Sequence, residues 1–311
     1  AAARRGLRTH PTEVGLVLAA AQLAPQEATG LLERALVSNP DDPRLHATLA
    51  ERWLAEGRSA DALSEARKAL AVDPTAVGAA RIELYAKEQL EGRLDPAGRA
   101  AIEAARVREV LDPKGAVASY TAVVDSHPRS ALALLARAGA RRATGDPGAI
   151  DDLVRAAAAD PQNIEAAGAA GLALSNAGRA TEASPLLDRA AAARPWDPAL
   201  AVGALRARIA TGRSQEALPP AVALAQRFPT DPKVQLVLVE LLVGANRIAD
   251  AYLAAKQALV ATRDPAIAAV FVQIAPAAGH PDEAAALLEA IVAQTGNQAL
   301  AAAAAKLRAA P

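Results

Sequence analysis

The stretch from residue 164 to residue 229 repeats itself without a gap, and its closing prolines, Pro195 and Pro229, lie 34 residues apart. Each copy holds two apolar segments of helical period with a Gly-Arg pair between them, at 178–179 and 212–213. A glycine just past an apolar helical segment suits the left-handed residue that ends many helices. Each copy is therefore expected to form a helix, a turn and a second helix.

A single pair of helices cannot bury its own apolar face, so such copies stack on their neighbours. The small residues Ala183 and Ala217 stand near the start of each second helix, where we expect the paired helices to cross in buried contact. The pattern predicts an all-α chain. Its function is expected to reside in an extended surface rather than in a pocket that the fold creates.

The same period continues on both sides of this pair. Gly57, Gly279 and Asn246 occupy the turn position, and asparagine also tolerates a positive φ. The expected repeats lie at about 9–40, 43–74, 97–128, 130–161, 164–195, 198–229, 232–263 and 265–296. A final helix at about 297–310 is expected to cap the last repeat, which gives a single solenoid over residues 1–311.

One interval departs from the period. The distance from Pro74 to Pro128 exceeds it by the length of one helix and its connection. We expect an extra helix at about 75–92, followed by the repeat at 97–128. The alternative makes 75–112 the repeat and leaves 114–126 unpaired. Such an insertion acts either as a hinge or as a simple irregularity of the stack.

The repeating unit resembles the tetratricopeptide repeat. The matching positions are Ala170, Gly171, Ala183, Leu187 and Pro195. Ala167 and Leu174 stand where that family places its Trp and Tyr. The resemblance implies antiparallel helix pairs that wind into a right-handed α-solenoid with a C-terminal capping helix, and a concave groove lined by the first helix of each pair.

That resemblance also places a candidate partner groove on the first helices. Its expected residues are Leu134, Arg141, Arg142, Leu172, Asn176, Val202, Arg206, Ile209, Leu236 and Glu240. They combine apolar side chains with sparse charge, which suits a helix or peptide segment of a partner protein. The first helices lack the Lys and Asn set with which chaperone-binding members of the family grip a terminal carboxylate, so that ligand is not expected.

Charge and composition narrow the possible partners. Lysine plus arginine and aspartate plus glutamate both number 34, which gives a formal net charge of zero and argues against nucleic acid as a partner. Without cysteine there are no disulfides, thiolate metal sites or cysteine nucleophiles. No apolar run is long enough to predict a transmembrane helix. Aromatic residues make up only 2%, so the helices are expected to pack closely through small side chains.

No motif predicts catalysis, a cofactor or a metal, so we expect that the chain is not an enzyme. The four histidines are scattered and are expected in loops or on the surface. The GDPG stretch at 145–148 is expected to be a turn, because it lacks the Lys-Ser/Thr ending of a phosphate-binding loop. Trp53 is expected in the core. Asp151 and Asp152 are expected near a helix start, where the helix dipole favours negative charge.

The favoured function is a non-catalytic interaction scaffold of bacterial origin. One alternative is the repeat arm of an envelope machine for polysaccharide export or pilus assembly, and another is the regulatory repeat region of a transferase. Residues 1–8 carry three arginines before an apolar run, but we expect that run to belong to the first repeat rather than to a signal peptide. The absence of methionine predicts a processed or excised chain. Periplasm and cytoplasm both remain open, as does the oligomeric state.

Overall fold

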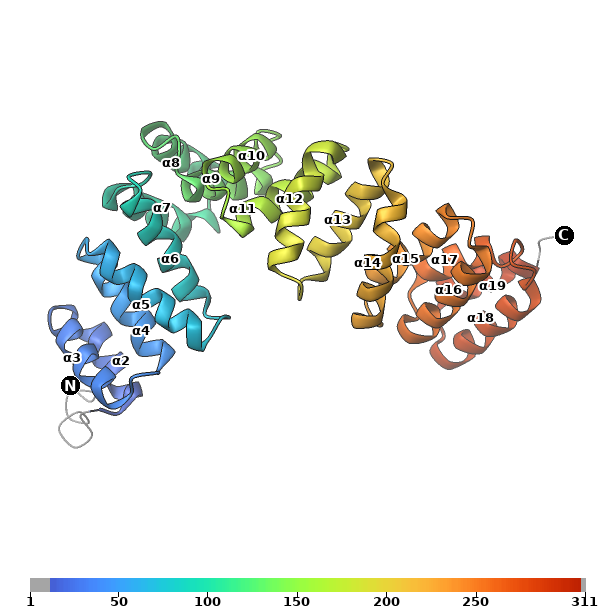
Figure 1. Ribbon diagram of the computed structural model, residues 1–311, viewed down its shortest axis with the longest axis horizontal. Coiled ribbons are helices and arrows are strands. Elements are labelled where there is room, and N and C mark those ends of the chain that lie inside the picture. The colour runs from blue at the N-terminus through green and yellow to red at the C-terminus, as the bar shows by residue number, and fades with distance from the viewer. Residues whose placement is uncertain (1–11, 309–311) are drawn as a thin grey trace. The chain divides into compact units, whose positions relative to one another are not determined.

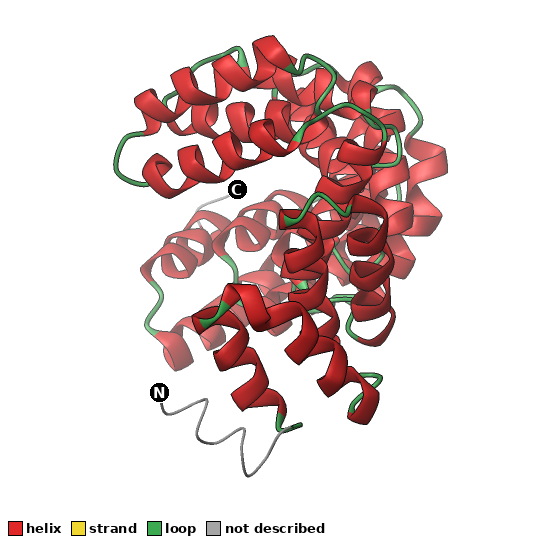
Figure 2. Cartoon of the chain, turned by 90° about the vertical axis from the view of Figure 1, so that its left-hand side faces the viewer, coloured by secondary structure: helices red, strands yellow, loops and turns green. Residues whose placement is uncertain are grey.

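The computed structural model describes residues 12–308, and over that range it contains eighteen α-helices joined by short turns, with no strand (Figure 2). The prediction of an all-α chain is confirmed. The helices form two compact units, residues 1–160 and residues 161–311, and each is described by itself. None of the described helices is long and apolar enough to span a membrane.

The first unit holds nine of the described helices (Figure 1). They are α2 (Val14–Leu23), α3 (Pro25–Ser38), α4 (Pro43–Ala55), α5 (Ser59–Val72), α6 (Val77–Leu90), α7 (Pro96–Glu109), α8 (Pro113–Ser126), α9 (Ala131–Ala143) and α10 (Ala149–Ala159). Helix α2, which covers the apolar run after the basic N-terminal residues, packs against α3 as the first member of a pair. Residues 1–8 themselves lie outside the described range.

The second unit holds the other nine (Figure 1). They are α11 (Ile164–Asn176), α12 (Ala180–Ala193), α13 (Pro198–Ala210), α14 (Ser214–Arg227), α15 (Pro232–Gly244), α16 (Ile248–Thr262), α17 (Pro265–Ile274), α18 (Pro281–Thr295) and α19 (Gln298–Arg308). Helix α19 packs against α17 and α18, where the capping helix was expected. Residues 309 and 310 of that expected helix lie outside the described range.

Local sequence signals explain where the helices begin and end. Asp197, Asp231 and Asp264 cap three first helices, because each carboxylate accepts backbone N–H groups of the first turn and a proline follows at the first helical position. The turn between the two helices of a pair contains a residue with positive φ in the five pairs where the sequence predicted one. These residues are Gly57, Gly178, Gly212 and Gly279, with φ between 77° and 79°, and Asn246, with φ 57°.

Close approach of helices depends on small residues, as the composition predicted. Ala183 and Ala217 are both fully buried. At Gly171 an added Cβ would lie 2.6 Å from Leu187 Cγ and 3.2 Å from the Leu187 backbone nitrogen, so α11 and α12 meet with no room for a methyl group. A Cβ added at Gly203 on α13 would likewise lie 2.8 Å from Leu172 Cδ2. These contacts set the spacing of the first two pairs in the second unit.

The expected extra helix coincides with α6, which packs against α4 and α5, whereas α7 packs against α8. The C-terminal end of α6 is tied to the start of α9. The carboxylate of Glu88 accepts hydrogen bonds from the Ser130 hydroxyl at 2.5 Å and from the Leu132 amide at 3.1 Å. Burial raises the pKa of Glu88, while these hydrogen bonds and Arg93 oppose the rise.

A second link ties the same region to the end of α10. The Arg93 guanidinium donates to the Ala159 carbonyl at 3.2 Å and to the Asp160 carboxylate at 3.3 Å, and Lys87 donates to Asp160 at 3.1 Å. Arg93 and Asp160 are both buried. Because buried charges are costly to separate, these contacts favour a fixed insertion over a free hinge.

Candidate partner-binding surface

In the second unit, the first helices α11, α13, α15 and α17 pack against one another in sequence. Helices α11, α13 and α15 each present side chains that their paired helix and their neighbours leave at least partly uncovered. We call the surface over α11, α13 and α15 the first-helix face, and it comprises Leu172, Asn176, Arg206, Ile209, Leu236 and Glu240. All six are exposed or half-buried, so the structure brings six of the ten predicted groove residues onto adjacent helices of one unit.

The apolar and charged members of this face are interleaved. Leu172, Ile209 and Leu236 are half-buried, one on each helix. Arg206 and Glu240 are exposed and have no ion-pair partner among the described residues. The face therefore offers three shallow apolar contacts and two uncompensated charges of opposite sign.

Val202 does not belong to this face. Its side chain is only 5% exposed and lies in the core cluster with Leu205 and Ala221. In the structure α13 packs against α12, α14 and two further first helices, so that most of its circumference is covered.

Two of the three candidate residues in the first unit are also unsuited to partner contact. Leu134 is fully buried. Arg141 donates to the Asp152 carboxylate at 2.7 Å and lies 3.3 Å from Asp146, so its charge is compensated within the chain. Only Arg142 is exposed without a described partner.

The sequence analysis missed a buried ion-pair cluster beside these residues. The guanidinium of Arg137 donates to both carboxylate oxygens of Asp152, at 2.6 and 2.8 Å, and both side chains are buried. Asp152 lies near the start of α10, as expected, but it points into the interface with α9 rather than toward solvent. The sequence does contain an arginine and an aspartate on two paired helices. Their pairing can be recognised only when the packing register of the two helices is known.

The histidines also depart from expectation in one case. His46 is buried at 6% exposure, and its ring lies between Glu65 and the Pro40 carbonyl. His127 and His280 are near carboxylates, at 3.4 Å from Asp95 and from Glu283 respectively. His10 lies outside the described range. Among the described residues, no group of three His, Asp or Glu side chains is arranged to hold a metal ion.

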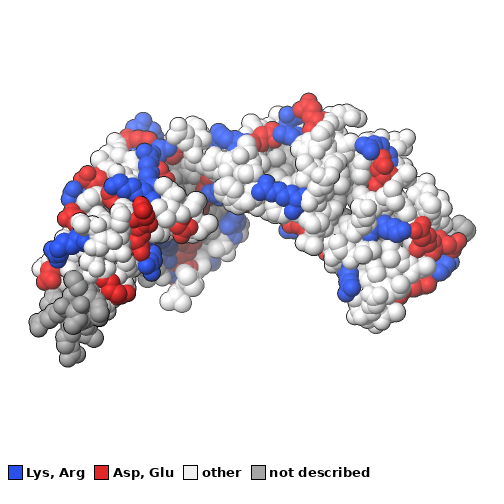
Figure 3. Space-filling view, turned by 60° about the horizontal axis from the view of Figure 1, so that its bottom comes forward, with Lys and Arg blue, Asp and Glu red and all other residues white. Residues whose placement is uncertain are grey.

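Charged side chains are dispersed over the surface seen in Figure 3. Lys and Arg lie among Asp and Glu in each unit, without a broad patch of one sign on this face. This distribution agrees with the formal net charge of zero.

The sequence matches no known protein-family profile and no curated protein. Similar solved structures include MamA AMB-1, at 22% identity over 53% of this chain and 95% of that chain, with a TM-score of 0.46. A tetratricopeptide repeat protein from Parabacteroides merdae has 13% identity over 86% of this chain and 98% of that one, with a TM-score of 0.43.

A third similar structure is the APC/C hetero-tetramer Cut9–Hcn1, at 16% identity over 92% of this chain and 59% of that one, with a TM-score of 0.48. The resemblance to tetratricopeptide repeats rests on the chain itself: its repeat period, its positive-φ turn residues, and the buried alanines Ala183 and Ala217.

Proposed function

We propose that this chain is a non-catalytic protein-interaction scaffold, and that the first-helix face holds a helix or peptide segment of a partner protein. The observation that carries the proposal is the combination of Leu172, Ile209 and Leu236 with the unpaired charges of Arg206 and Glu240 on three packed helices. Apolar contact contributes binding free energy, complementary charges contribute specificity and association rate, and this face offers both.

The apolar side chains supply contact area in small portions. Each belongs to a different helix, so a partner must lie across the three helices to touch all of them. A partner helix presents apolar side chains at three- and four-residue spacing, which suits a row of separate shallow contacts. Affinity then accumulates over the repeats rather than from one deep pocket.

The charges supply orientation. Arg206 lies on α13 and Glu240 on the neighbouring α15, so a partner with an acidic and a basic residue binds in one direction and is repelled in the other. Charges at the edge of an interface act mainly on specificity and association rate. The scaffold is therefore expected to select its partner by charge order as well as by apolar contact.

In the test, a photo-crosslinking amino acid is placed at position 206 or at position 227 of the full chain. The chain is expressed in the source cell, and the cells are irradiated. Arg227 lies on the second helix α14, is exposed, and serves as the matched position away from the first-helix face. We expect a defined adduct from position 206 and none from position 227. A shared set of adducts, or adducts from position 227 alone, contradicts the proposal.

Once the adduct is identified, the same face is tested with purified partner. Arg206→Glu combined with Glu240→Lys is expected to weaken binding by more than about tenfold, because each reversed charge then faces a like charge. Arg227→Glu is expected to leave binding unchanged. Both variants alter exposed positions, so their unfolding free energies should stay within about 0.5 kcal/mol of the parent chain.

A further inference from the structure

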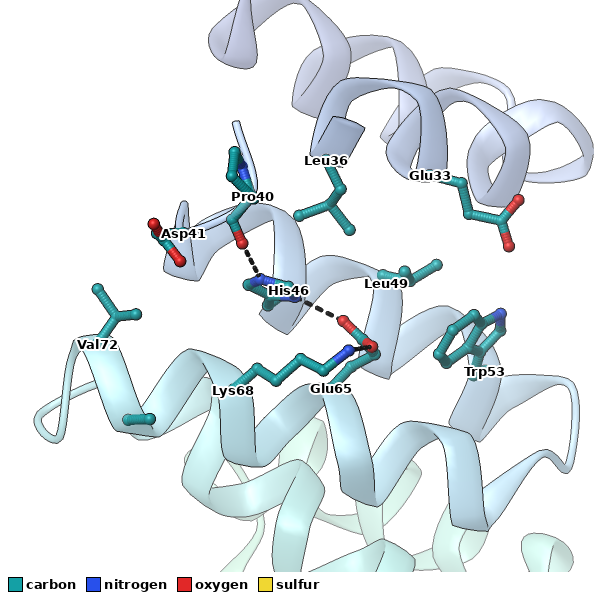
Figure 4. Close-up of a pocket in the computed structure, with 11 residues that line it drawn as sticks. Glu33, Leu36, Pro40, Asp41, His46, Leu49, Trp53, Glu65, Lys68 and Val72 are labelled. Atoms are coloured by element: carbon teal, nitrogen blue, oxygen red, sulfur yellow. Dashed lines mark hydrogen bonds and ion pairs between the residues drawn. The ribbon is translucent and has the colours of Figure 1, made fainter. Parts of the chain in front are cut away.

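A pocket of about 550 Å³ opens in the first unit between α3 and α5, with α4 as its floor (Figure 4). It lies on second helices rather than on the first-helix face, and it belongs to the other compact unit. Its volume falls within the range of sites that hold small ligands or inserted side chains. The residues that line it separate into a hydrogen-bonded centre and two acidic ends.

The centre is a buried acid, Glu65, that is already held by neighbouring side chains. Glu65 accepts from Lys68 Nζ at 2.6 Å and contacts His46 Nδ1 at 2.5 Å. The other ring nitrogen of His46 donates to the Pro40 carbonyl at 2.7 Å, since a carbonyl oxygen can only accept. These contacts hold the floor of the pocket in one arrangement.

The two ends carry uncompensated negative charge. Glu33 on α3 and Asp41 in the turn before α4 are both exposed, and neither has a hydrogen-bond or ion-pair partner among the described residues. Figure 4 shows Glu33 on the side of Trp53 and Asp41 on the opposite side, near Val72. Two separated carboxylates at the rim of one pocket favour an occupant with two cationic groups.

The walls suit the stems and heads of basic side chains. Leu36, Leu49 and Val72 provide apolar surface on the three helices, along which the methylenes of Arg or Lys can lie. Trp53 is half-buried, and it already holds the guanidinium of Arg58 4.4 Å from its ring centroid. An aromatic ring beside an unpaired carboxylate attracts a cation through both its π face and the charge.

We propose that this pocket binds a basic segment of a partner protein, with one cationic side chain between Trp53 and Glu33 and a second beside Asp41. The apolar walls favour Arg and Lys side chains over small cations, because the methylene groups of these side chains can pack against the walls. The site is independent of the first-helix face, so that either one can fail without the other.

The test uses Trp53 as its own reporter. The chain has two tryptophans, and Trp196 lies 64% exposed in a turn of the other unit, so the full chain with Trp196→Phe retains Trp53 alone. The probes are acetylated, amidated peptides with two arginines separated by one to four alanines. We expect a saturable change in Trp53 fluorescence that weakens with added salt, and no such change with glutamine in place of arginine.

Matched variants assign the effect to the pocket. Glu33→Gln combined with Asp41→Asn is expected to weaken the arginine peptides by more than about tenfold through loss of both ion pairs. Glu51→Gln removes an exposed carboxylate on α4 that does not line the pocket, and it should leave binding unchanged. Melting curves of all three chains should coincide, which separates lost binding from lost fold.

Several outcomes overturn the proposal. Equal responses to arginine and glutamine peptides, or equal binding by the double variant and Glu51→Gln, show that the two carboxylates do not recognise a cation. Tighter binding of glutamate peptides assigns the pocket to an acidic occupant. If deletion of residues 1–11, which include Arg4, Arg5 and Arg8, raises peptide affinity by more than about tenfold, the occupant is this chain's own basic segment rather than a partner's.

Discussion

The two units of the chain bury different kinds of polar side chain. Among the described residues, the buried histidine and the buried acidic and basic side chains all lie in the unit 1–160. They are His46, Glu65, Glu88, Arg93, Arg137, Asp152 and Asp160. The buried polar residues of the unit 161–311 are uncharged, namely Asn163, Ser184 and Gln235.

This difference follows the regularity of the sequence. In the unit 161–311 each helix pair follows the same period, and contacts between small neighbouring residues suffice to set the arrangement. In the unit 1–160, the end of α6 is linked to the start of α9 and to the end of α10, which come later in the chain. Buried charge pairs tolerate only one arrangement, at the cost that losing one partner leaves the other charge buried. The buried charged contacts around α6 therefore favour one arrangement of those helices, while His46–Glu65 and Arg137–Asp152 each join the two helices of one pair.

The largest expected loss of stability comes from removing one partner of a buried charge pair in the unit 1–160. Asp152→Ala leaves Arg137 buried without its carboxylate, and a buried pair broken in this way costs about 3–5 kcal/mol of unfolding free energy. Asp151→Ala changes the exposed neighbour and should stay within about 0.5 kcal/mol. Urea unfolding followed by circular dichroism measures both, and equal midpoints would show that the buried pair contributes nothing specific.

The next largest effect is expected from a substitution that disturbs the close helix packing of the unit 161–311. Gly171→Ala forces a methyl group into Leu187 and is expected to cost roughly 1–3 kcal/mol by overpacking. Gly139→Ala, inside α9 of the irregular unit, would meet only Glu109 Oε1 at 3.8 Å and should stabilise by roughly 0.5–1 kcal/mol through helix propensity. Thermal melts of the two variants should therefore shift in opposite directions, and a shared direction would refute the assigned role of Gly171.

The smallest expected effect is a pH dependence of stability that arises from Glu88, a buried carboxyl group of the unit 1–160. Burial raises the pKa of Glu88 above its ordinary 4.5 in the folded chain. Its contribution to stability is therefore fully present below the unfolded pKa and is lost as pH rises through the folded pKa. The stability of the parent chain relative to Glu88→Gln should fall as the pH rises above the ordinary value of 4.5, as measured by urea unfolding at a series of pH values. A relative stability that rises over this range would show that ion pairing to Arg93 outweighs burial.

The fold was predictable from the sequence because its signals are local. The period, the turn glycines and the Asp-Pro starts act within one helix pair, so Gly178, Gly212 and Asn246 could be assigned to turns before any packing was known. The helix at 77–90 followed from the excess length between Pro74 and Pro128.

The surface was less predictable, because burial depends on which sides of a helix its neighbours cover. Leu134 and Val202 sit at first-helix positions that resemble those of Leu172 and Leu236, yet only the latter two remain accessible. His46 was placed at the surface because its acid partner, Glu65, is on another helix. Such pairs become visible only when the register between helices is known.

The Asp-Pro caps have a consequence for how such a chain lengthens. Asp197 opens one helix pair and Asp231 opens the next, and each pair contains its own turn glycine or asparagine. A duplication that begins at one capping aspartate and ends just before the next therefore copies a complete set of start, turn and stop signals. The gene segment that encodes one pair can then be copied as a whole, and new binding surface arises when the exposed residues of the copies diverge.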